Sequence, residues 1–223
     1  MSKLLKIERI PDFASGFYAL VARKAPFLKD FHKNVADEVT SRISSGRILD
    51  VGTGPGYLPL QIAKRSKHLE IVGIDLSPAM IEMATRNAET MGVAQRVKFR
   101  IGDAANLPFE DDYFDLVIST LSMHHWLKPT KCLKEDNRVL KKGGEAWIYE
   151  FRRDTTREVN AQLKARYGRF MSFLLLNIVR AHSSMYLNEV EEVLSSSEIG
   201  FSKRNIEDRG VVIKLRLSKA SGT

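Results

Sequence analysis

Cysteine is scarce in this sequence and long apolar runs are missing, and each shortage excludes a class of protein. Cys132 is the one cysteine among 223 residues. An intramolecular disulfide is therefore impossible, and so is a zinc site built on several thiolates. The most apolar stretch, residues 170–179, is too short to cross a bilayer. No apolar segment follows a basic start, so we expect no secretory signal and a cytoplasmic, reducing location.

Size and composition indicate one globular domain. Hydrophobic residues make up 43% and charged residues 28% of the chain, which is typical of a folded protein. A chain of this length can bury roughly 70% of its unfolded surface, so it needs no disulfide or metal ion for stability.

Positive charge exceeds negative charge only towards the two ends of the chain. The formal net charge is +8, to which residues 1–50 contribute +3, residues 51–150 nothing and residues 151–223 +5. A basic balance favours nucleic acid or an anionic membrane as a partner. The plain alternative is a solvated basic surface.

Apolar runs alternate with amphipathic stretches through the middle of the chain. Five strands are predicted, with four intervening helices on short connections; the strands lie at 47–51, 69–74, 97–101, 114–119 and 145–151. Ser77 and Pro78 begin the helix that runs to about residue 91, and Gly92 follows it as a cap. A helix at 129–140 is expected to end at the basic and glycine run 141–144. This alternation predicts a doubly wound parallel sheet.

The two ends of the chain have a hydrophobic pattern different from that of the middle. Residues 1–45 look helical, residues 155–183 form one long helix or a helical pair, and a helix at 187–196 precedes two strands at 203–208 and 211–217. The predicted fold is therefore an α/β, doubly wound, seven-stranded and mostly parallel sheet with a C-terminal antiparallel hairpin, helices on both faces and a helical cap. We expect a single domain over 1–223, made of a lid (1–45), a cofactor-binding core (46–151), the cap (152–186), and the last helix and hairpin (187–217).

A glycine-rich loop follows the first predicted strand. In the segment DVGTGPG, residues 50–56, the glycines permit a tight turn and let a ligand approach the main chain. No Gly-Lys-Ser/Thr follows, so the loop is not a P-loop. A purely structural turn is the alternative, because the glycine pattern alone is common.

Two aspartates at the ends of later strands indicate which kind of ligand the glycine loop would bind. Asp75 ends the second strand, where a carboxylate can accept hydrogen bonds from both ribose hydroxyls of an adenosine; this does not separate NAD from S-adenosylmethionine. Asp103 follows the third strand, where it can accept a hydrogen bond from the exocyclic amine of adenine. The next amide, of Ala104, can donate to a ring nitrogen.

Four segments in register then resemble one family. ILDVGTGPG, VGIDLSPAM, GDAANLPFEDDYFDLVIS and LKKGGEAWIYEF are similar to the class I S-adenosylmethionine-dependent methyltransferases, above all to the small-molecule group that includes the ubiquinone/menaquinone biosynthesis methyltransferases. The resemblance covers residues 45–151 well and residues 187–217 loosely. Residues 1–40 and 152–186 match nothing specific.

The resemblance implies S-adenosyl-L-methionine as cofactor and S-adenosyl-L-homocysteine as product. It implies that Asp50 contacts the methionine amino group, that Gly52, Thr53 and Gly54 bring the backbone close to the methionine part, and that Gly56 packs at the helix start. Asp75 would bind the ribose, and Ser119 would lie near the sulfonium. The adenine would be contacted by Leu76, Met80, Asp103 and Ala104. The alternatives are a loop-capping role for Asp50 and plain core positions for Leu76 and Met80.

Candidate catalytic residues follow the fourth strand. His124 or His125 could act as a base, line the acceptor pocket or make a structural hydrogen bond. We expect no metal site, because two adjacent histidines have poor ligand geometry. Tyr149 and Glu150 are predicted to point to opposite faces of the sheet, so one of them could face the acceptor. Tyr18 would lie over the cofactor if residues 10–24 form a lid.

The sequence limits the chemical class of the methyl acceptor but does not identify it. The fourth strand lacks the Asn/Asp-Pro-Pro-Tyr/Phe motif of enzymes that methylate base amines, and Cys132 lacks the Pro-Cys context of a nucleophile. We expect a small, partly apolar or anionic acceptor. An RNA- or protein-directed methyltransferase that uses the basic ends is the alternative, supported by aromatic residues among basic ones at 166–170. An NAD-dependent oxidoreductase, a catalytically silent cofactor-binding module and a homodimer are also considered.

Overall fold

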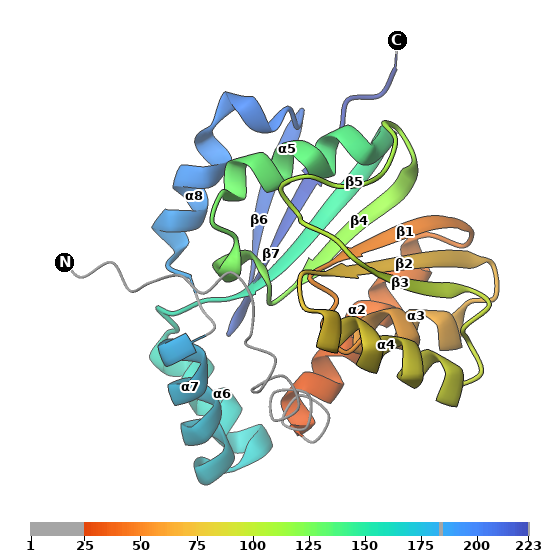
Figure 1. The fold of residues 1–223 in the computed structure, drawn as a ribbon. Coiled ribbons are helices and arrows are strands. Elements are labelled where there is room, and N and C mark those ends of the chain that lie inside the picture. Colours follow the sequence, from red (N-terminus) through yellow and green to blue (C-terminus); the bar gives the residue numbers. More distant parts are fainter. Residues whose placement is uncertain (1–24, 183–184, 223) are drawn as a thin grey trace.

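Seven strands form one sheet in the order β3-β2-β1-β4-β5-β7-β6 (Figure 1). The computed structural model describes residues 25–182 and 185–222. Strands β1 to β5 pair in parallel, and β7 is antiparallel to both β5 and β6. The strands are β1 (Gly46–Val51), β2 (Leu69–Asp75), β3 (Val97–Ile101), β4 (Phe114–Thr120), β5 (Leu140–Phe151), β6 (Lys203–Arg209) and β7 (Val212–Ser218). The predicted sheet with a C-terminal antiparallel hairpin is confirmed.

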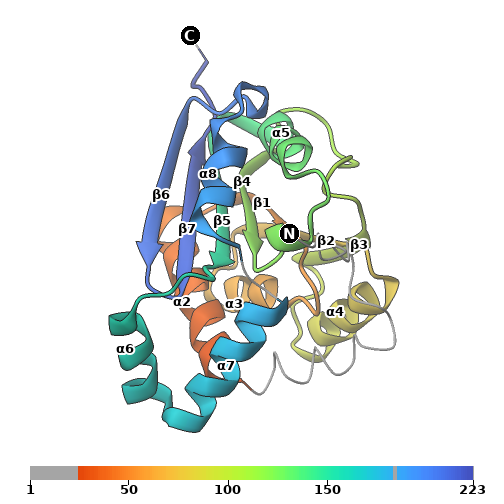
Figure 2. The same ribbon diagram turned by 90° about the vertical axis from the view of Figure 1, so that its left-hand side faces the viewer.

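Helices cover both faces of the sheet (Figures 1 and 2). Adjacent residues of each strand point to opposite faces, so Ile48 belongs to one apolar core and Leu49 to the other. The first core is covered by α2 (Pro26–Arg42), α3 (Tyr57–Arg65) and α4 (Pro78–Thr90), and the second by α5 (Pro129–Val139) and α8 (Leu187–Ser195). Because both faces are covered, the inner strands read as nearly continuous apolar runs.

The start and end of α4 follow the local sequence signals. The Ser77 hydroxyl accepts a hydrogen bond from the Met80 amide at 3.4 Å, and Pro78 occupies the first helical position. Gly92 follows the helix with a φ of +66°, a left-handed conformation that glycine adopts without strain. The predicted helix bounds are confirmed here.

A helical hairpin leaves the carboxyl end of β5 and lies beside α2, away from the sheet (Figures 1 and 2). It consists of α6 (Arg157–Tyr167) and α7 (Arg169–His182), so the helical pair is the alternative that holds. Gly168 separates the two helices with a φ of +80°. The hairpin contacts α2 through Tyr167, whose ring centroid lies 5.8 Å from that of Phe27. Tyr18 and the rest of the predicted lid over residues 10–24 lie outside the described residues.

Two local predictions were wrong. Residues 141–144 do not end a helix: α5 stops at Val139 and the basic and glycine run belongs to β5, where the Lys141 Nζ atom lies 2.7 Å from Asp115 Oδ1. The pairing register between β4 and β5 shifts there, which a flexible glycine run accommodates. The four helices expected between the first five strands are also too many, because residues 102–113 connect β3 to β4 without an α-helix.

A partly buried charge network fixes α2 against the sheet. Glu38 accepts hydrogen bonds from Lys214 Nζ at 2.6 Å, from Arg209 Nη1 at 2.6 Å and from the Tyr149 hydroxyl at 2.9 Å. The Lys214 ammonium also lies 3.5 Å from the centre of the Trp147 ring. Burial opposes the ionisation of Glu38, but its three hydrogen-bond donors outweigh burial and lower the pKa of the carboxyl to about 2. Because α2 carries residues of the pocket described next, this network positions the site.

Candidate active site

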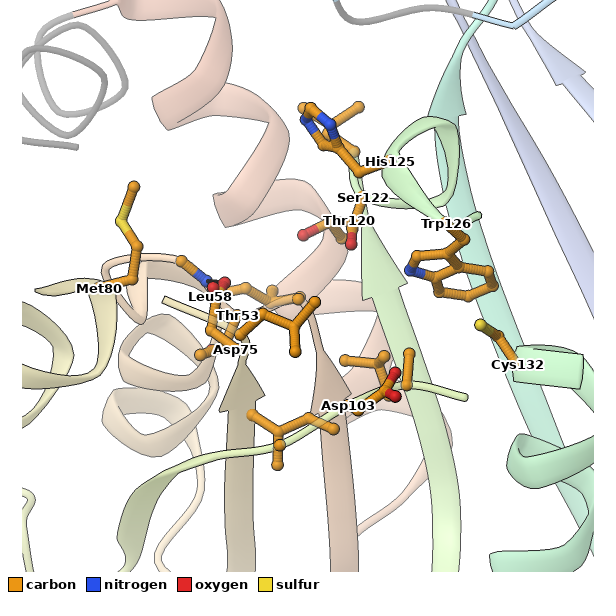
Figure 3. A pocket seen from close by; sticks show the side chains of 18 of the residues that line it. Thr53, Leu58, Asp75, Met80, Asp103, Thr120, Ser122, His125, Trp126 and Cys132 are labelled. Atoms are coloured by element: carbon orange, nitrogen blue, oxygen red, sulfur yellow. Dashed lines mark hydrogen bonds between the residues drawn. The ribbon is translucent and has the colours of Figure 1, made fainter. Parts of the chain in front are cut away.

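A pocket of about 310 Å³ lies at the carboxyl ends of the parallel strands (Figure 3). This volume is in the range of small-molecule sites, and the edge is the one at which open α/β sheets bind ligands. The loops after β1, β2, β3 and β4 supply most of the lining, and α2 and the first turns of α3, α4 and α5 supply the rest. In Figure 3 the His125 ring lies at the upper end and Asp103 at the lower end, with Thr120 and Asp75 between them.

The glycine loop brings main chain to the pocket. Gly52 and Gly54 line it and have φ values of +73° and +52°. A Cβ atom on Gly52 would lie 2.0 Å from the Ser122 Oγ atom, so the loop after β4 closes against this glycine. A Cβ atom on Gly54 would meet nothing within 4 Å, which leaves the backbone there open to a ligand. Gly56 packs instead of lining the pocket, because a Cβ atom there would lie 2.6 Å from the Phe99 ring.

Asp75 joins the glycine loop to the start of α4. Its Oδ2 atom accepts a hydrogen bond from the Gly54 amide at 2.9 Å, and its Oδ1 atom accepts one from the Ser77 amide at 2.9 Å. Each carboxylate oxygen has a second lone pair for a ligand hydroxyl. Burial raises the pKa of Asp75, and the backbone donors limit that rise. Asp75 is therefore held rigidly by main-chain amides while it lines the pocket.

Asp50 is a buried acid without a partner. It is 1% exposed, and neither carboxylate oxygen has a hydrogen-bond partner among the described residues. Burial raises the pKa of Asp50 to about 7; the Thr53 hydroxyl, which lies near but is not in hydrogen-bond contact, opposes that rise, and the charge of Asp75 adds to it. The residue lies directly before Val51 and Gly52, which line the pocket. A cationic amine bound there would supply the donors that this carboxylate lacks.

The residues that the sequence analysis assigned to the adenine line one pocket. Asp103 and Ala104 line the pocket, and Asp103 Oδ1 accepts a hydrogen bond from the Ala105 amide at 2.8 Å. Leu76 and Met80 line the same pocket and give it an apolar wall. These residues come from separate loops, and the sheet brings them together with Asp75.

Ser119 and Thr120, the last two residues of β4, have different surroundings. Ser119 is fully buried and does not line the pocket; its hydroxyl donates to the Val51 carbonyl at 2.8 Å. Thr120 and Leu121 line the pocket instead. Leu121 has a φ of +55°, an uncommon conformation for a residue with a side chain. The chain thus turns sharply where it leaves the sheet and enters the pocket wall.

His124 and His125 occupy different environments although they are adjacent. His125 lines the pocket, whereas His124 lies behind it, with Nδ1 3.0 Å from Glu150 Oε2. The centres of the two imidazole rings are 4.1 Å apart. Tyr149 turns the other way towards Glu38, so the predicted opposite orientation of Tyr149 and Glu150 is confirmed. The structure therefore places only one of the two histidines at the ligand surface.

Several lining residues were not predicted from the sequence. Leu28 and His32 reach the pocket from α2, and Tyr57, Lys128, Lys131 and Cys132 also line it. Burial lowers the pKa of His32 to about 4, so its imidazole is neutral at neutral pH. The apolar periodicity of α2 predicts that one face of the helix is buried, but the sequence does not show which residues that face contacts.

Two other features are absent from the part of the chain that the structure describes. In residues 25–182 and 185–222 no group of three or more His, Cys, Asp or Glu side chains is placed to hold a metal ion. None of the helices in the described part of the chain combines the length and the apolar character needed to span a bilayer.

Comparison with known families matches residues 43–199 to the methyltransferase domain family. The chain therefore belongs to this family, and its fold and motifs are those of a class I S-adenosylmethionine-dependent methyltransferase domain. S-adenosylmethionine is the cofactor of this class and S-adenosylhomocysteine the product. The unpartnered Asp50, the open main chain at Gly54 and the amide-held Asp75 fit the amino, methionine and ribose groups of that cofactor.

The match to curated relatives covers only part of the length of each relative. The ubiquinone/menaquinone biosynthesis C-methyltransferase of Geotalea daltonii is 37% identical over 108 residues, which are 48% of this chain and 46% of that protein. The demethylmenaquinone methyltransferase of Thermotoga maritima is 29% identical over 161 residues, 71% of this chain and 67% of that protein. The match thus spans about half the length of the first relative.

Solved structures extend the likeness over the whole chain. A protein of Methanococcus maripaludis assigned as an S-adenosyl-L-methionine-dependent methyltransferase is 25% identical with a TM-score of 0.74, and the match covers 100% of this chain and 99% of that one. The [4+2]-cyclase SpnF is 19% identical with a TM-score of 0.65 over 85% of this chain and 82% of its own. The second likeness shows the fold alone, so the reaction has to be argued from the site.

Proposed function

We propose that the protein transfers a methyl group from S-adenosylmethionine to a small, partly apolar or anionic acceptor. One observation carries this proposal: a single pocket is lined by the glycine loop, Asp75 and Asp103 and, at its other end, by α2 and His125. The first set suits a nucleoside with an amino-acid tail, and the second leaves a separate wall for the molecule that accepts the methyl group.

The residues that line the pocket divide the binding of the cofactor among them. Asp75 binds the ribose hydroxyls, Asp103 and Ala104 bind the adenine edge, and Asp50 binds the amino group directly or through water. Gly52, Thr53 and Gly54 bring main chain close to the methionine part, and Leu76 and Met80 contact the adenine. Gly56 acts through packing at the start of α3. Ser119 acts indirectly, because its bond to Val51 holds the end of β4 against the glycine loop.

Methyl transfer requires alignment more than reactive side chains. When bound, the cofactor supplies an electrophilic methyl group whose bond to sulfur breaks as its bond to the acceptor atom forms. The protein has to hold the acceptor atom in line and exclude water. Leu28, Leu121 and Trp126 supply apolar lining for this purpose. In this proposal His125, which lines the pocket, takes up the proton that the acceptor loses, and His124, whose ring centre is 4.1 Å from that of His125, positions it.

The lining also limits the acceptor. The pocket of about 310 Å³ is of the size of small-molecule sites, which favours a small acceptor. Lys128 and Lys131 line the same pocket and attract anionic groups. The relatives named for ubiquinone, menaquinone or demethylmenaquinone methylation make aromatic, partly apolar rings a reasonable first class to test.

Equilibrium binding followed by methyl transfer tests this proposal. The protein should bind S-adenosylhomocysteine and not NADH, and it should transfer labelled methyl from S-adenosylmethionine to some member of a panel of phenols, quinols, carboxylates and amines. Binding of NADH alone would refute the assignment. Transfer to RNA or to a protein, with none to small molecules, would favour the alternative acceptor class.

A further inference from the structure

The outer face of α7 carries an exposed apolar stripe. Phe170, Phe173 and Leu174 are 77%, 67% and 42% exposed and follow the i, i+3, i+4 spacing of one helix face. Ser172 and Leu176, on the opposite side, are buried. Large exposed apolar side chains elsewhere in the described residues are isolated on other elements. A contiguous apolar patch on a folded protein marks an interaction site.

The hairpin that carries this stripe is strongly basic. Residues 157–182 contain five arginines or lysines and one acidic residue, Glu158. Lys164 and Arg169 are exposed and have no ion pair among the described residues. Arg166, also exposed, pairs with Asp30 at 2.9 Å. The apolar stripe is thus accompanied by two cations, Lys164 and Arg169, that no acidic side chain of the described residues pairs with.

The hairpin also belongs to the end of the molecule that holds the pocket. It leaves the carboxyl end of β5 and lies beside α2, whose Leu28 and His32 line the pocket (Figures 1 and 2). Tyr167 of the hairpin donates its hydroxyl hydrogen to Asp30 Oδ2 at 3.0 Å, which ties α6 to the same helix. A surface that engages α7 is therefore mechanically connected to the acceptor side of the site.

We propose that the stripe of Phe170, Phe173 and Leu174, with Arg169 next to it and Lys164 on the neighbouring α6, is a docking surface for an anionic membrane. The apolar side chains would enter the boundary between headgroups and acyl chains, while the cations pair with lipid phosphates. A second copy of this chain fits less well, because a two-fold contact would place the same cations against each other. RNA fits less well too, because Leu174 offers no plane for stacking a base. The proposal goes beyond methyl transfer and does not depend on it.

Vesicle co-sedimentation tests this surface with the full chain. The wild type should bind phosphatidylcholine vesicles that contain phosphatidylglycerol, bind pure phosphatidylcholine much less, and lose binding as salt rises. The double variant Phe170→Ser, Phe173→Ser should bind the anionic vesicles at least about tenfold more weakly, because it loses most of the inserted apolar area. Ile101→Ser is the matched control, since Ile101 is 56% exposed on β3 and should not affect binding.

Two further measurements separate docking from loss of the fold and from other partners. Both phenylalanines are exposed, so the double variant should keep its melting temperature and its affinity for S-adenosylhomocysteine. In a Phe173→Trp variant, the new fluorescence should shift to the blue on anionic vesicles and be quenched by brominated acyl chains. The proposal is overturned if the wild type ignores anionic vesicles, if the double variant binds them as well as the wild type does, or if the stripe proves necessary only for dimerisation or for binding RNA.

Discussion

His124 Nδ1 lies 3.0 Å from Oε2 of Glu150, and the backbone amide of the same histidine donates to that same oxygen at 3.1 Å. Glu150 is fully buried, and its second oxygen accepts a hydrogen bond from the Phe151 amide at 2.9 Å. Because both carboxylate oxygens already accept backbone donors, the arrangement assigns the ring proton to Nδ1 of His124. The pair fixes the short 3₁₀ turn Met123–His125 and thereby the ring of His125 in the pocket wall.

The two histidines should therefore fail in different ways when they are replaced. His125→Ala should lower kcat for methyl transfer by at least about tenfold with little change in cofactor affinity, because it removes a group at the acceptor wall. His124→Ala should lower the free energy of unfolding by about 1–3 kcal/mol, because it leaves buried Glu150 without its side-chain partner. Steady-state kinetics and urea unfolding of both variants distinguish these roles. Equal effects of the two changes on kcat and on the free energy of unfolding would contradict a catalytic role for His125 and a structural role for His124.

Asp75 should control cofactor affinity. Asp75→Ala removes the acceptor for the ribose hydroxyls and for the Gly54 amide, so the Kd for S-adenosylhomocysteine should rise by more than about tenfold. Asp103→Ala should have a smaller effect, because one polar contact is lost. Asp111→Ala, an exposed acid outside the pocket lining, serves as the control. Calorimetric titration measures all three, and an unchanged Kd for the Asp75 variant would remove this residue from the site.

Asp50 should make the ligand-free protein less stable as the pH rises. Its pKa is about 7 in the folded chain against 3.8 for the ordinary group. Between these values the folded state keeps a proton that the unfolded state releases, so stability falls as the pH rises through this window. At pH 7 the cost is about 2–4 kcal/mol.

Asp50→Asn should therefore raise the stability of the ligand-free protein at neutral pH and flatten this pH dependence, while weakening cofactor binding. Urea unfolding from pH 4.5 to 8, with and without S-adenosylhomocysteine, measures both effects. A variant with the wild-type pH slope would show that Asp50 is not the group responsible.

Gly54 offers a way to block the pocket without damaging the fold. An alanine there meets no atom within 4 Å and has only the cost of a left-handed backbone, about 1–2 kcal/mol. The new methyl group should nevertheless occupy space that a ligand needs to approach the main chain, so affinity for S-adenosylhomocysteine should fall. Gly92→Ala is a suitable control, because it has a similar φ and open surroundings but lies outside the pocket. Equal affinities in the two variants would argue against close backbone approach at Gly54.

The Glu38 network should contribute substantially to stability. Glu38→Gln leaves Lys214, which is 1% exposed, without its charged partner, and should lower the free energy of unfolding by about 2–3 kcal/mol. Glu70→Gln is the matched control, because the pair of Glu70 with Arg47 is exposed and should contribute less than about 0.5 kcal/mol. Urea unfolding compares them. A Glu38 variant as stable as the control would mean that Lys214 finds another partner.

The sequence predicts the cofactor end of the site better than the acceptor end. Asp50, Asp75 and Asp103 each follow an apolar run, and the carboxyl ends of parallel strands meet at one edge, so local patterns place them together. Leu28 and His32 come from α2, which precedes the first strand and is not one of the loops that follow a strand. Their place in the pocket depends on how α2 packs, which no local pattern determines.

Single-residue choices at strand ends are equally hard to predict. Adjacent side chains of a strand point to opposite faces, so a shift of one position separates Thr120, which lines the pocket, from Ser119, which bonds to Val51. The run 141–144 shows the same limit. Lysines and glycines often end a helix, but Asp115 on β4 binds Lys141 and draws the run into the sheet.

The anchoring of α2 to the last strand pair has a consequence for the order of folding. Glu38 bonds to Arg209 and Lys214, which lie 171 and 176 positions later in the chain, so these contacts close very long loops. The glycine loop, Asp75 and Asp103 need only the nearby strands β1 to β4. The nucleoside half of the pocket therefore depends on contacts of shorter sequence separation than the Glu38 network, which can close only when the β6–β7 hairpin has docked.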